Sequence, residues 1–381
     1  MLDEVSITRQ LQREEKFSPP FCPESSCINH LKERISGKFW IRIGWKELKR
    51  FPYISQRFQC KACETTFSAS VFRLDYRQKV WGQNCEIFRL HRLGVSKRET
   101  AREIGHSERL VRTRLRNMAR WAELKNFQLT EELKIEEAIV YDGLENFAFS
   151  QYDPNNINHA VGKDSLFIYD YNFAPLNRKG RMSPGQVTRK AELEEEHGKY
   201  PVDAIRSSTK RLFERLLGRC KNSLTLYTDR HYQYRKAVEI DLAEKPIQHF
   251  KVSSKIHRNF RNHLFAVNNI DLQVRHNLAP FKRETIAFSK HEIAMLDSFT
   301  LNAVYRNYMR PKFWGTHRSD PECSKKSPGM ELAITKKILS FDDFFAERVF
   351  PTQVTLNEDA KARYNRQMPT SRREIALAPA I

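Results

Sequence analysis

Two aspartates occupy positions from which carboxylates could hold a pair of divalent cations. Asp142 follows the apolar run 138–141, and Asp229 follows a second apolar run at 223–228. Both runs have the composition of β-strands, and each is predicted to end at its aspartate. Carboxylates at the ends of adjacent strands can bind two Mg²⁺ or Mn²⁺ ions. Such a pair activates a water molecule and stabilises the leaving oxygen of a phosphodiester.

A third carboxylate is expected from a helix packed across the same sheet. Asp271 lies in the run 268–275, with Arg275 one helical turn later on the same face. The alternative is Glu284, but Pro280 stands between the two acids and should bend or end the helix. We therefore prefer Asp271.

Basic side chains accompany these acids. Arg230 and His231 follow the second aspartate directly, and Arg275 shares the helix of the third acid. They are candidates for positioning a phosphate, although each is equally compatible with a plain surface charge.

Four of the seven cysteines form two close pairs, Cys22 with Cys27 and Cys60 with Cys63. Two such pairs brought together give the tetrahedral sulfur ligation typical of structural Zn²⁺. Four protein ligands leave no open position for catalysis, so we predict a structural zinc ribbon, with residues 57–60 and 66–68 forming a β-hairpin around the second cysteine pair. His30 lies near the first pair and could replace a ligand, although a surface histidine is the more common case.

The next segment has the pattern of a helix-turn-helix. Its apolar periodicity and its glycines predict three helices and two tight turns: 79–93, Gly94, 97–104, Gly105 and 108–121. Ser96 and Ser107 are suitable N-caps, and Glu99 would complete a capping box with Ser96.

The third of these helices is the candidate recognition helix, because it is dense in arginine. Five arginines could meet phosphates and base edges in a major groove: Arg109, Arg112, Arg114, Arg116 and Arg120. An ordinary three-helix bundle with a solvated basic face is the alternative interpretation.

The overall charge agrees with a polyanionic partner. The chain carries 66 Lys and Arg against 46 Asp and Glu, a net charge of +20. Such an excess favours nucleic acid, because neutralising phosphates releases counterions. No apolar run reaches the roughly 18 residues of a membrane span, and the N-terminus does not look like a signal peptide. We expect a cytoplasmic protein with reduced cysteines.

These patterns divide the chain into four segments. We predict a zinc ribbon at 1–75, a helix-turn-helix at 76–125, an α/β catalytic domain at 136–310, and a partly disordered tail at 311–381. The tail contains an apolar series that could dock on the core or on a second subunit: Leu332, Ile338, Leu339, Phe341, Phe344 and Phe345.

The chain resembles bacterial insertion-sequence transposases with an RNase H-like catalytic domain of the DDE type. The likeness covers about residues 22–311. It rests on the two cysteine pairs, the helix-turn-helix, the run Tyr-Thr-Asp at 227–229, the run Arg-Glu-Thr-Ile-Ala-Phe at 283–288, and Tyr-Arg-Asn-Tyr at 305–308.

The resemblance implies a mixed five-stranded sheet flanked by helices. It also implies cleavage of double-stranded DNA at transposon ends, transfer of the 3′-hydroxyl to target DNA, and a homodimer near the bacterial nucleoid. The first two catalytic acids fall on Asp142 and Asp229. The third is usually glutamate in such enzymes, whereas our preferred residue, Asp271, is an aspartate. Two alternatives stay open: a DNA-binding regulator or inactive relic without catalysis, and a nuclease without strand transfer.

Overall fold

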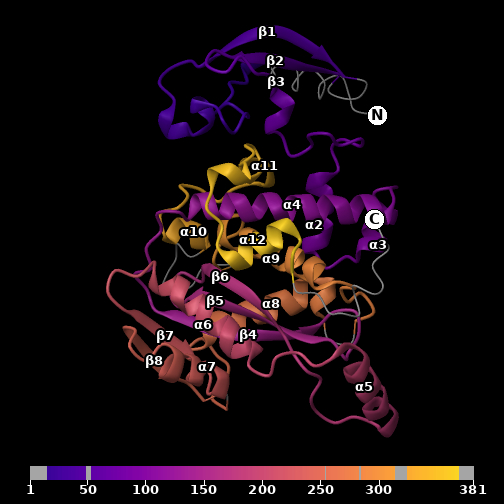
Figure 1. Ribbon diagram of the computed structural model, residues 1–381, viewed down its shortest axis with the longest axis vertical. Helices are drawn as coiled ribbons and strands as arrows, with labels where there is room; N and C mark the ends of the chain where they lie inside the picture. Colours follow the sequence, from indigo (N-terminus) through magenta and orange to yellow (C-terminus); the bar gives the residue numbers. More distant parts are fainter. Residues whose placement is uncertain (1–14, 49–52, 254, 283–284, 314–323, 369–381) are drawn as a thin grey trace.

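The computed structural model describes residues 15–48, 53–253, 255–282, 285–313 and 324–368. Glu284, the alternative third acid, lies outside these ranges. The fold is mixed α/β with two sheets. A small antiparallel sheet stands at one end of the molecule, a layer of helices lies in the middle, and a larger sheet occupies the other end (Figure 1).

The small sheet is built from β1 (Trp40–Glu47), β2 (Ile54–Cys60) and β3 (Thr66–Ser68). Phe58 on β2 pairs with Phe67 on β3, so the hairpin predicted around the second cysteine pair is confirmed. The core of this unit is small, aromatic and shared with the cysteines; its buried members include Phe21, Phe39, Trp40, Phe58, Phe67 and Phe72.

Three helices follow, α2 (Asn84–Arg92), α3 (Lys97–Glu103) and α4 (Glu108–Leu129). The two predicted turns form at Gly94 and Gly105, which adopt φ of 78° and 65°. Left-handed backbone of this kind favours glycine.

Both predicted N-caps form: Ser96 accepts a bond from the backbone of Glu99, and Ser107 accepts one from Leu110. The carboxylate of Glu99 bonds Arg102. The predicted outer boundaries were wrong. The first helix starts at 84 instead of 79, and α4 continues eight residues past 121 because its last turns are buried by the rest of the protein.

The larger sheet has five strands in the order β6-β5-β4-β7-β8. Their bounds are β4 (Ile139–Phe147), β5 (Pro154–Gly162), β6 (Ile168–Pro175), β7 (Leu224–Thr228) and β8 (Ile247–Lys251). The pairs β4–β5 and β5–β6 are antiparallel, whereas β4–β7 and β7–β8 are parallel. The mixed five-stranded sheet is therefore present.

Helices cover both faces of this sheet. On one face α6 (Ala204–Leu217) packs through Leu212, Phe213 and Leu216. On the other face α8 (Phe265–Asn277) packs through Ile270 and Val274. The helix α8 stops before Pro280, as predicted.

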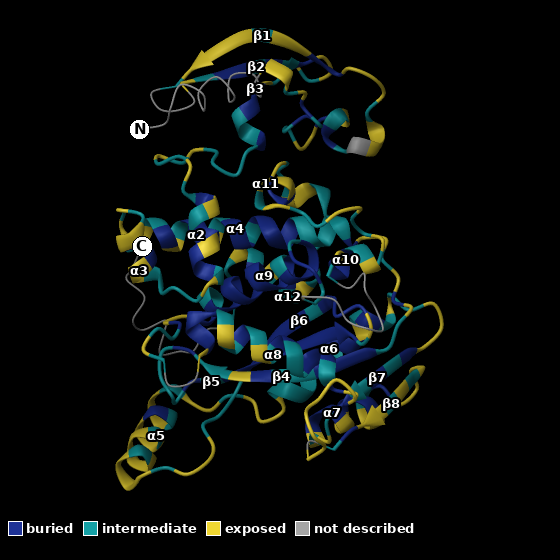
Figure 2. Ribbon diagram, turned by 180° about the vertical axis from the view of Figure 1, so that it is seen from behind, coloured by how far each residue is buried: buried dark blue, intermediate teal, exposed yellow. Residues whose placement is uncertain are grey.

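A third helix, α9 (Glu292–Tyr308), lies between the sheet and α4 and is buried along most of its length (Figure 2). Helix α5 (Pro184–His197) projects from the far end of the molecule (Figure 1). The short helix α7 (Tyr232–Lys236) follows β7. No helix in the described ranges has the length and apolarity needed to cross a bilayer.

Within the predicted partly disordered tail, residues 324–368, the C-terminal segment, are folded. This segment contains α10 (Pro328–Glu331), α11 (Phe341–Phe344) and α12 (Glu358–Asn365). The predicted docking of its apolar residues on the core is observed: Phe344 and Phe345 are buried in the same cluster as Trp121 of α4. The parts of the predicted tail at 314–323 and 369–381 lie outside the described residues.

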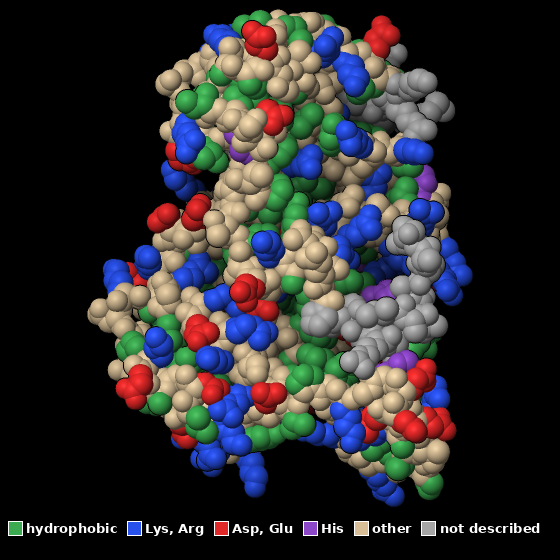
Figure 3. All heavy atoms as spheres, viewed as in Figure 1, with side chains coloured by type: hydrophobic (Ala, Val, Ile, Leu, Met, Phe, Trp, Pro, Cys, Tyr) green, Lys and Arg blue, Asp and Glu red, His purple; other side chains and the backbone are tan. Residues whose placement is uncertain are grey.

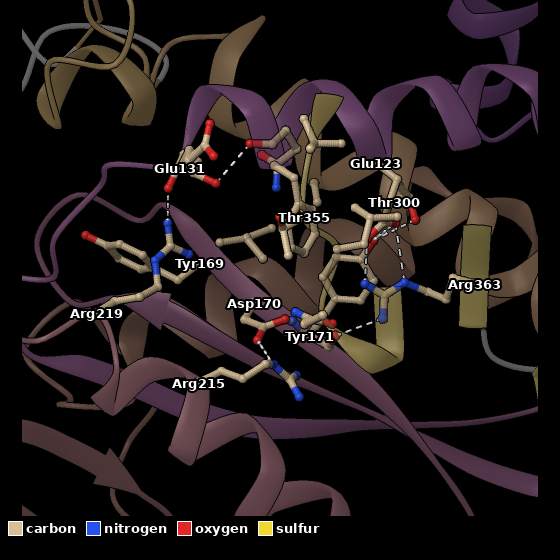
Figure 4. A pocket seen from close by; sticks show the side chains of 18 of the residues that line it. Glu123, Glu131, Tyr169, Asp170, Tyr171, Arg215, Arg219, Thr300, Thr355 and Arg363 are labelled. Carbon is tan, nitrogen blue, oxygen red and sulfur yellow. Dashed lines mark hydrogen bonds and ion pairs between the residues drawn. The ribbon is translucent and has the colours of Figure 1, made fainter. Parts of the chain in front are cut away.

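Buried charge holds this segment in place (Figure 4). Arg363 of α12 donates to Glu123 of α4 at 2.7 Å, and both side chains are only 5% exposed. Arg215 of α6 bridges Asp170 of β6 and Asp359 of α12, at 2.6 and 2.8 Å. Removing one member of such a pair leaves an unpaired buried charge, so α12 is fixed to two other layers.

Candidate active site and candidate metal centre

Three aspartates that are distant in sequence line one cavity of about 720 Å³. The parallel register pairs Tyr141 of β4 with Thr228 of β7. The next residues on the two strands, Asp142 and Asp229, are therefore neighbours. Asp271 reaches the same cavity from α8. The three predicted acids thus line the same cavity. One prediction was wrong: Asp142 lies inside β4, which runs on to 147, and not at its end.

The other two acids act on Asp142. Burial, with added repulsion from Asp271 and Asp229, raises the pKa of Asp142 to about 7. Carboxylates that share a poorly solvated site cannot all stay ionised unless a cation neutralises them. Ionisation of all three acids is therefore unfavourable near neutral pH, and a bound cation would reduce their repulsion.

His159 is a site residue that the sequence analysis missed. It lies opposite Asp142 on β5 and is fully buried. Its Nε2 is 3.2 Å from Oδ1 of Asp271, and its Nδ1 is 3.2 Å from the Ile157 carbonyl. Burial lowers the pKa of this imidazole, but the Asp271 carboxylate and the Ile157 carbonyl outweigh it and raise the pKa. An imidazolium here can donate from both nitrogens and so orient the third acid.

A chain of buried amides reaches the cavity from the C-terminal segment. Asn172 donates to the Ser208 carbonyl and to the Asp359 carboxylate, which can only accept. Its own oxygen therefore accepts from Asn158 at 3.0 Å, and the oxygen of Asn158 accepts from Asn156 at 2.8 Å. The hydrogen bond from each amide to the one before it, starting from Asp359, therefore fixes which way that amide points.

Asn156 and Tyr234 complete the wall beside Asp142. Tyr234 donates to Oδ1 of Asp142 at 3.4 Å. Asn156 packs over Gly143, where a Cβ would lie 2.0 Å from the Asn156 nitrogen. Only glycine leaves room for that amide, so the residue directly after Asp142 shapes the cavity. No single residue in the sequence signalled this arrangement.

Basic residues stand at the rim. His231 and Arg275 line the cavity, as expected, whereas Arg230 is exposed and does not. The sequence analysis missed Arg258, which also lines the cavity. Arg275 donates to the Glu145 carbonyl at 2.9 Å, which fixes its stem close to the acids.

The four predicted cysteines form the second site. Sγ of Cys22 lies 3.6 Å from that of Cys63, and Sγ of Cys27 lies 3.7 Å from that of Cys60. All four sulfur atoms lie within 4.8 Å of one another. In the described part of the chain, no other set of three or more Cys, His, Asp or Glu is as tight. These cysteines could hold a metal ion.

The protein environment favours the thiolate at Cys60 and the neutral thiol at Cys22 and Cys27. Burial acts to raise the pKa of Cys60, but the amides of Cys63 and Ala62 and the Asn29 side chain lower it to about 7. Burial instead raises the pKa of Cys22. A cation at the centre would stabilise all four thiolates.

His30 is neither a ligand nor a surface residue. It is 2% exposed, and it bonds the Cys22 carbonyl at 2.8 Å and the Thr352 hydroxyl at 2.7 Å. It therefore joins the cysteine unit to the C-terminal segment. Phe350 of that segment packs against Phe21 and Phe72 in the same core.

The candidate DNA-contact arginines of α4 divide into two groups. Arg109, Arg112 and Arg116 are exposed, and Arg120 is half-buried. Helical geometry of about 100° per residue places these four on one face. Arg114 was predicted wrongly: it is 4% exposed and donates to the Val80 carbonyl, because it lies about 140° around the helix from Arg109.

Comparison of the sequence with protein-family models and with curated proteins finds no match. The interpretation of both sites therefore depends on their geometry and chemistry.

Proposed function

We propose that this protein is a metal-dependent DNA nuclease and strand transferase of the transposase type, with a structural zinc ion held by Cys22, Cys27, Cys60 and Cys63. The single observation that carries the proposal is the cavity that Asp142, Asp229 and Asp271 line together, with the pKa of Asp142 raised to about 7. The strand order and directions of the larger sheet support an RNase H-like arrangement.

In this proposal Asp142 and Asp229 bind Mg²⁺ or Mn²⁺ between them, and Asp271 supplies a further oxygen ligand. All-oxygen donors of this kind suit hard divalent cations. A bound pair of ions lowers the pKa of the attacking water and stabilises the departing 3′-oxygen. His159 holds Asp271 in place, and Tyr234 does the same for Asp142.

The basic residues supply the contacts to DNA. Arg275, Arg258 and His231 stand at the rim of the cavity, where a scissile phosphate would lie. The exposed arginines of α4 contribute a second positive surface. The net charge of +20 supports a nucleic-acid partner, and transposition would require two copies of the chain to join two DNA ends.

Incubation of the protein with end-labelled duplex DNA and Mg²⁺ or Mn²⁺ tests this function. The substrate carries the terminal sequences that flank the gene. Asp142→Asn and Asp229→Asn should abolish cleavage while duplex binding persists, and Asp164→Asn, an exposed aspartate outside the cavity, should leave cleavage unchanged. Binding without cleavage by the wild type under all these conditions would favour a DNA-binding regulator. Cleavage without joined products would favour a nuclease.

A further inference from the structure

A second cavity, of about 290 Å³, opens where three distant parts of the chain meet. The segment after the cysteine unit contributes Arg73, Tyr76 and Arg77, helix α4 contributes Arg120, and the C-terminal segment contributes Arg348. Tyr364 completes the aromatic part of the wall. None of the described residues that line this cavity is acidic.

The charges here are held in place. The guanidinium of Arg120 lies 4.3 Å from the Tyr364 ring, and that of Arg77 lies 5.2 Å from the Tyr76 ring. Arg348 donates to the Val71 carbonyl at 3.3 Å. Aromatic faces and carbonyls orient the guanidinium groups without neutralising them.

Most of this positive charge has no acidic partner in the described part of the chain. Arg73 pairs with Asp75 at 3.2 Å, so its charge is compensated. Arg348 faces Arg77 and Arg120, and burial together with these two neighbours lowers its pKa. The Nε of Arg120 is buried without a hydrogen-bond partner among the described residues. Clustered guanidinium groups of this kind are suited to bind phosphate oxygens.

The cavity continues the arginine face of α4. Arg109, Arg112, Arg116 and Arg120 lie within about 80° of arc on that helix, and the last of them enters the cavity. Lys and Arg side chains are also numerous on the surface between the small sheet and the helical layer (Figure 3). The positive charge of the cavity is therefore extended along one face of α4.

We infer that the cavity lined by Arg77, Arg120 and Arg348 is a binding site for a backbone phosphate of duplex DNA, and that the DNA continues along the exposed face of α4. This inference rests on the proposed function only in taking DNA as the partner. It does not require the acidic cavity to be catalytic. It also gives the C-terminal segment a role in DNA binding.

The test is the salt dependence of binding to a short fluorescein-labelled duplex of arbitrary sequence, followed by anisotropy. Each lost phosphate contact reduces the slope of log K against log salt by about 1. Because both arginines are assigned to one phosphate, the variant Arg77→Gln/Arg120→Gln should lose about 1 from the slope. The control Arg189→Gln/Lys221→Gln removes the same charge from exposed positions of α5 and of the turn before β7, and should keep the wild-type slope.

A thermal melt checks the folding of each variant. Arg77→Gln alone alters an exposed side chain and should lose up to about 1 from the slope, so it replaces the double variant if that one is unstable. Equal slopes for the variant and the control would overturn the inference while leaving DNA binding and catalysis intact. A wild type that does not bind the duplex would overturn the proposed function and this inference together.

Discussion

The cysteine cluster and the acidic cavity bring their side chains together in opposite ways. The four cysteines come from two short pairs within 42 residues of sequence, and their sulfur atoms already lie within 4.8 Å of one another. The three aspartates come from β4, the end of β7 and α8, and they line an open cavity of about 720 Å³. A closed set of four soft ligands suits a structural ion, whereas an open set of hard ligands leaves room for water and substrate.

Removal of the metal from the cysteine centre should have the largest effect on stability. The aromatic core of this unit is small and includes the cysteines themselves, so metal binding should supply most of its folding free energy, on the order of 10 kcal/mol. We expect Cys60→Ser to abolish zinc binding and to expose residues 15–72 to proteolysis. Cys85→Ser, at an exposed position, should change neither. A cysteine unit that stays folded without metal would contradict the assignment of the four cysteines as a structural metal site.

Breaking the buried ion pair that fixes the C-terminal segment ranks second. Glu123→Gln leaves the buried guanidinium of Arg363 without its carboxylate. We expect a loss of about 3–5 kcal/mol in the free energy of unfolding by denaturant. Glu358→Gln, at the exposed start of α12, is the control. Equal stabilities for the two variants would show that the segment is not held as described.

Replacement of Asp142 should change the free energy of unfolding by a smaller amount and should stabilise the fold. Its folded-state pKa of about 7 lies above the ordinary value of 3.8. The unfolded chain therefore ionises first as pH rises, and the fold loses stability between about pH 4 and pH 7. Asp142→Asn should remove this penalty and stabilise the metal-free protein above pH 7.

The expected gain is roughly 2 kcal/mol. At about 1.4 kcal/mol per pKa unit, the pKa shift of Asp142 alone would give about twice this stabilisation. We halve it because the Asp142 side chain is partly exposed to the cavity. Thermal melts at pH 5 and pH 8 measure it, and the gain should shrink at pH 5. Asp164→Asn should show no such pH-dependent gain. A destabilised Asp142→Asn at pH 8 would contradict the picture of repelling acids.

Replacement of His30 should have the smallest effect. His30→Asn loses the bond to Thr352 but removes no metal ligand. We expect about 1 kcal/mol of destabilisation and unchanged zinc content by atomic absorption. Loss of zinc in this variant would mean that the histidine is a ligand after all.

Local patterns in the sequence were sufficient for the hairpin around the second cysteine pair, the caps Ser96 and Ser107, and the strands that carry Asp142 and Asp229. Such features depend on neighbours within a few residues. The buried Arg114 could also have been predicted, because the periodicity of α4 already places it opposite Arg109. The prediction grouped the arginines of α4 by charge alone, without the helix face on which each one lies.

Long-range features could not be predicted in this way. His159 reaches Asp271 only through the register of β4 with β5 and the docking of α8. The order of the C-terminal segment depends on partners far away in sequence, such as Glu123 for Arg363. The amide chain from Asp359 to Asn156 needs β5, β6 and α12 in place at once.

Binding of Mn²⁺ followed by electron paramagnetic resonance tests the central claim most directly. The zinc-loaded protein is titrated at pH 8, and bound Mn²⁺ is counted for the wild type, Asp142→Asn, Asp229→Asn and Asp164→Asn. We predict Mn²⁺ binding by the wild type and by Asp164→Asn, with at least a tenfold loss of affinity in the other two variants. Equal Mn²⁺ affinity in all four proteins, or no binding by the wild type, would contradict the assignment of the three aspartates as a metal site.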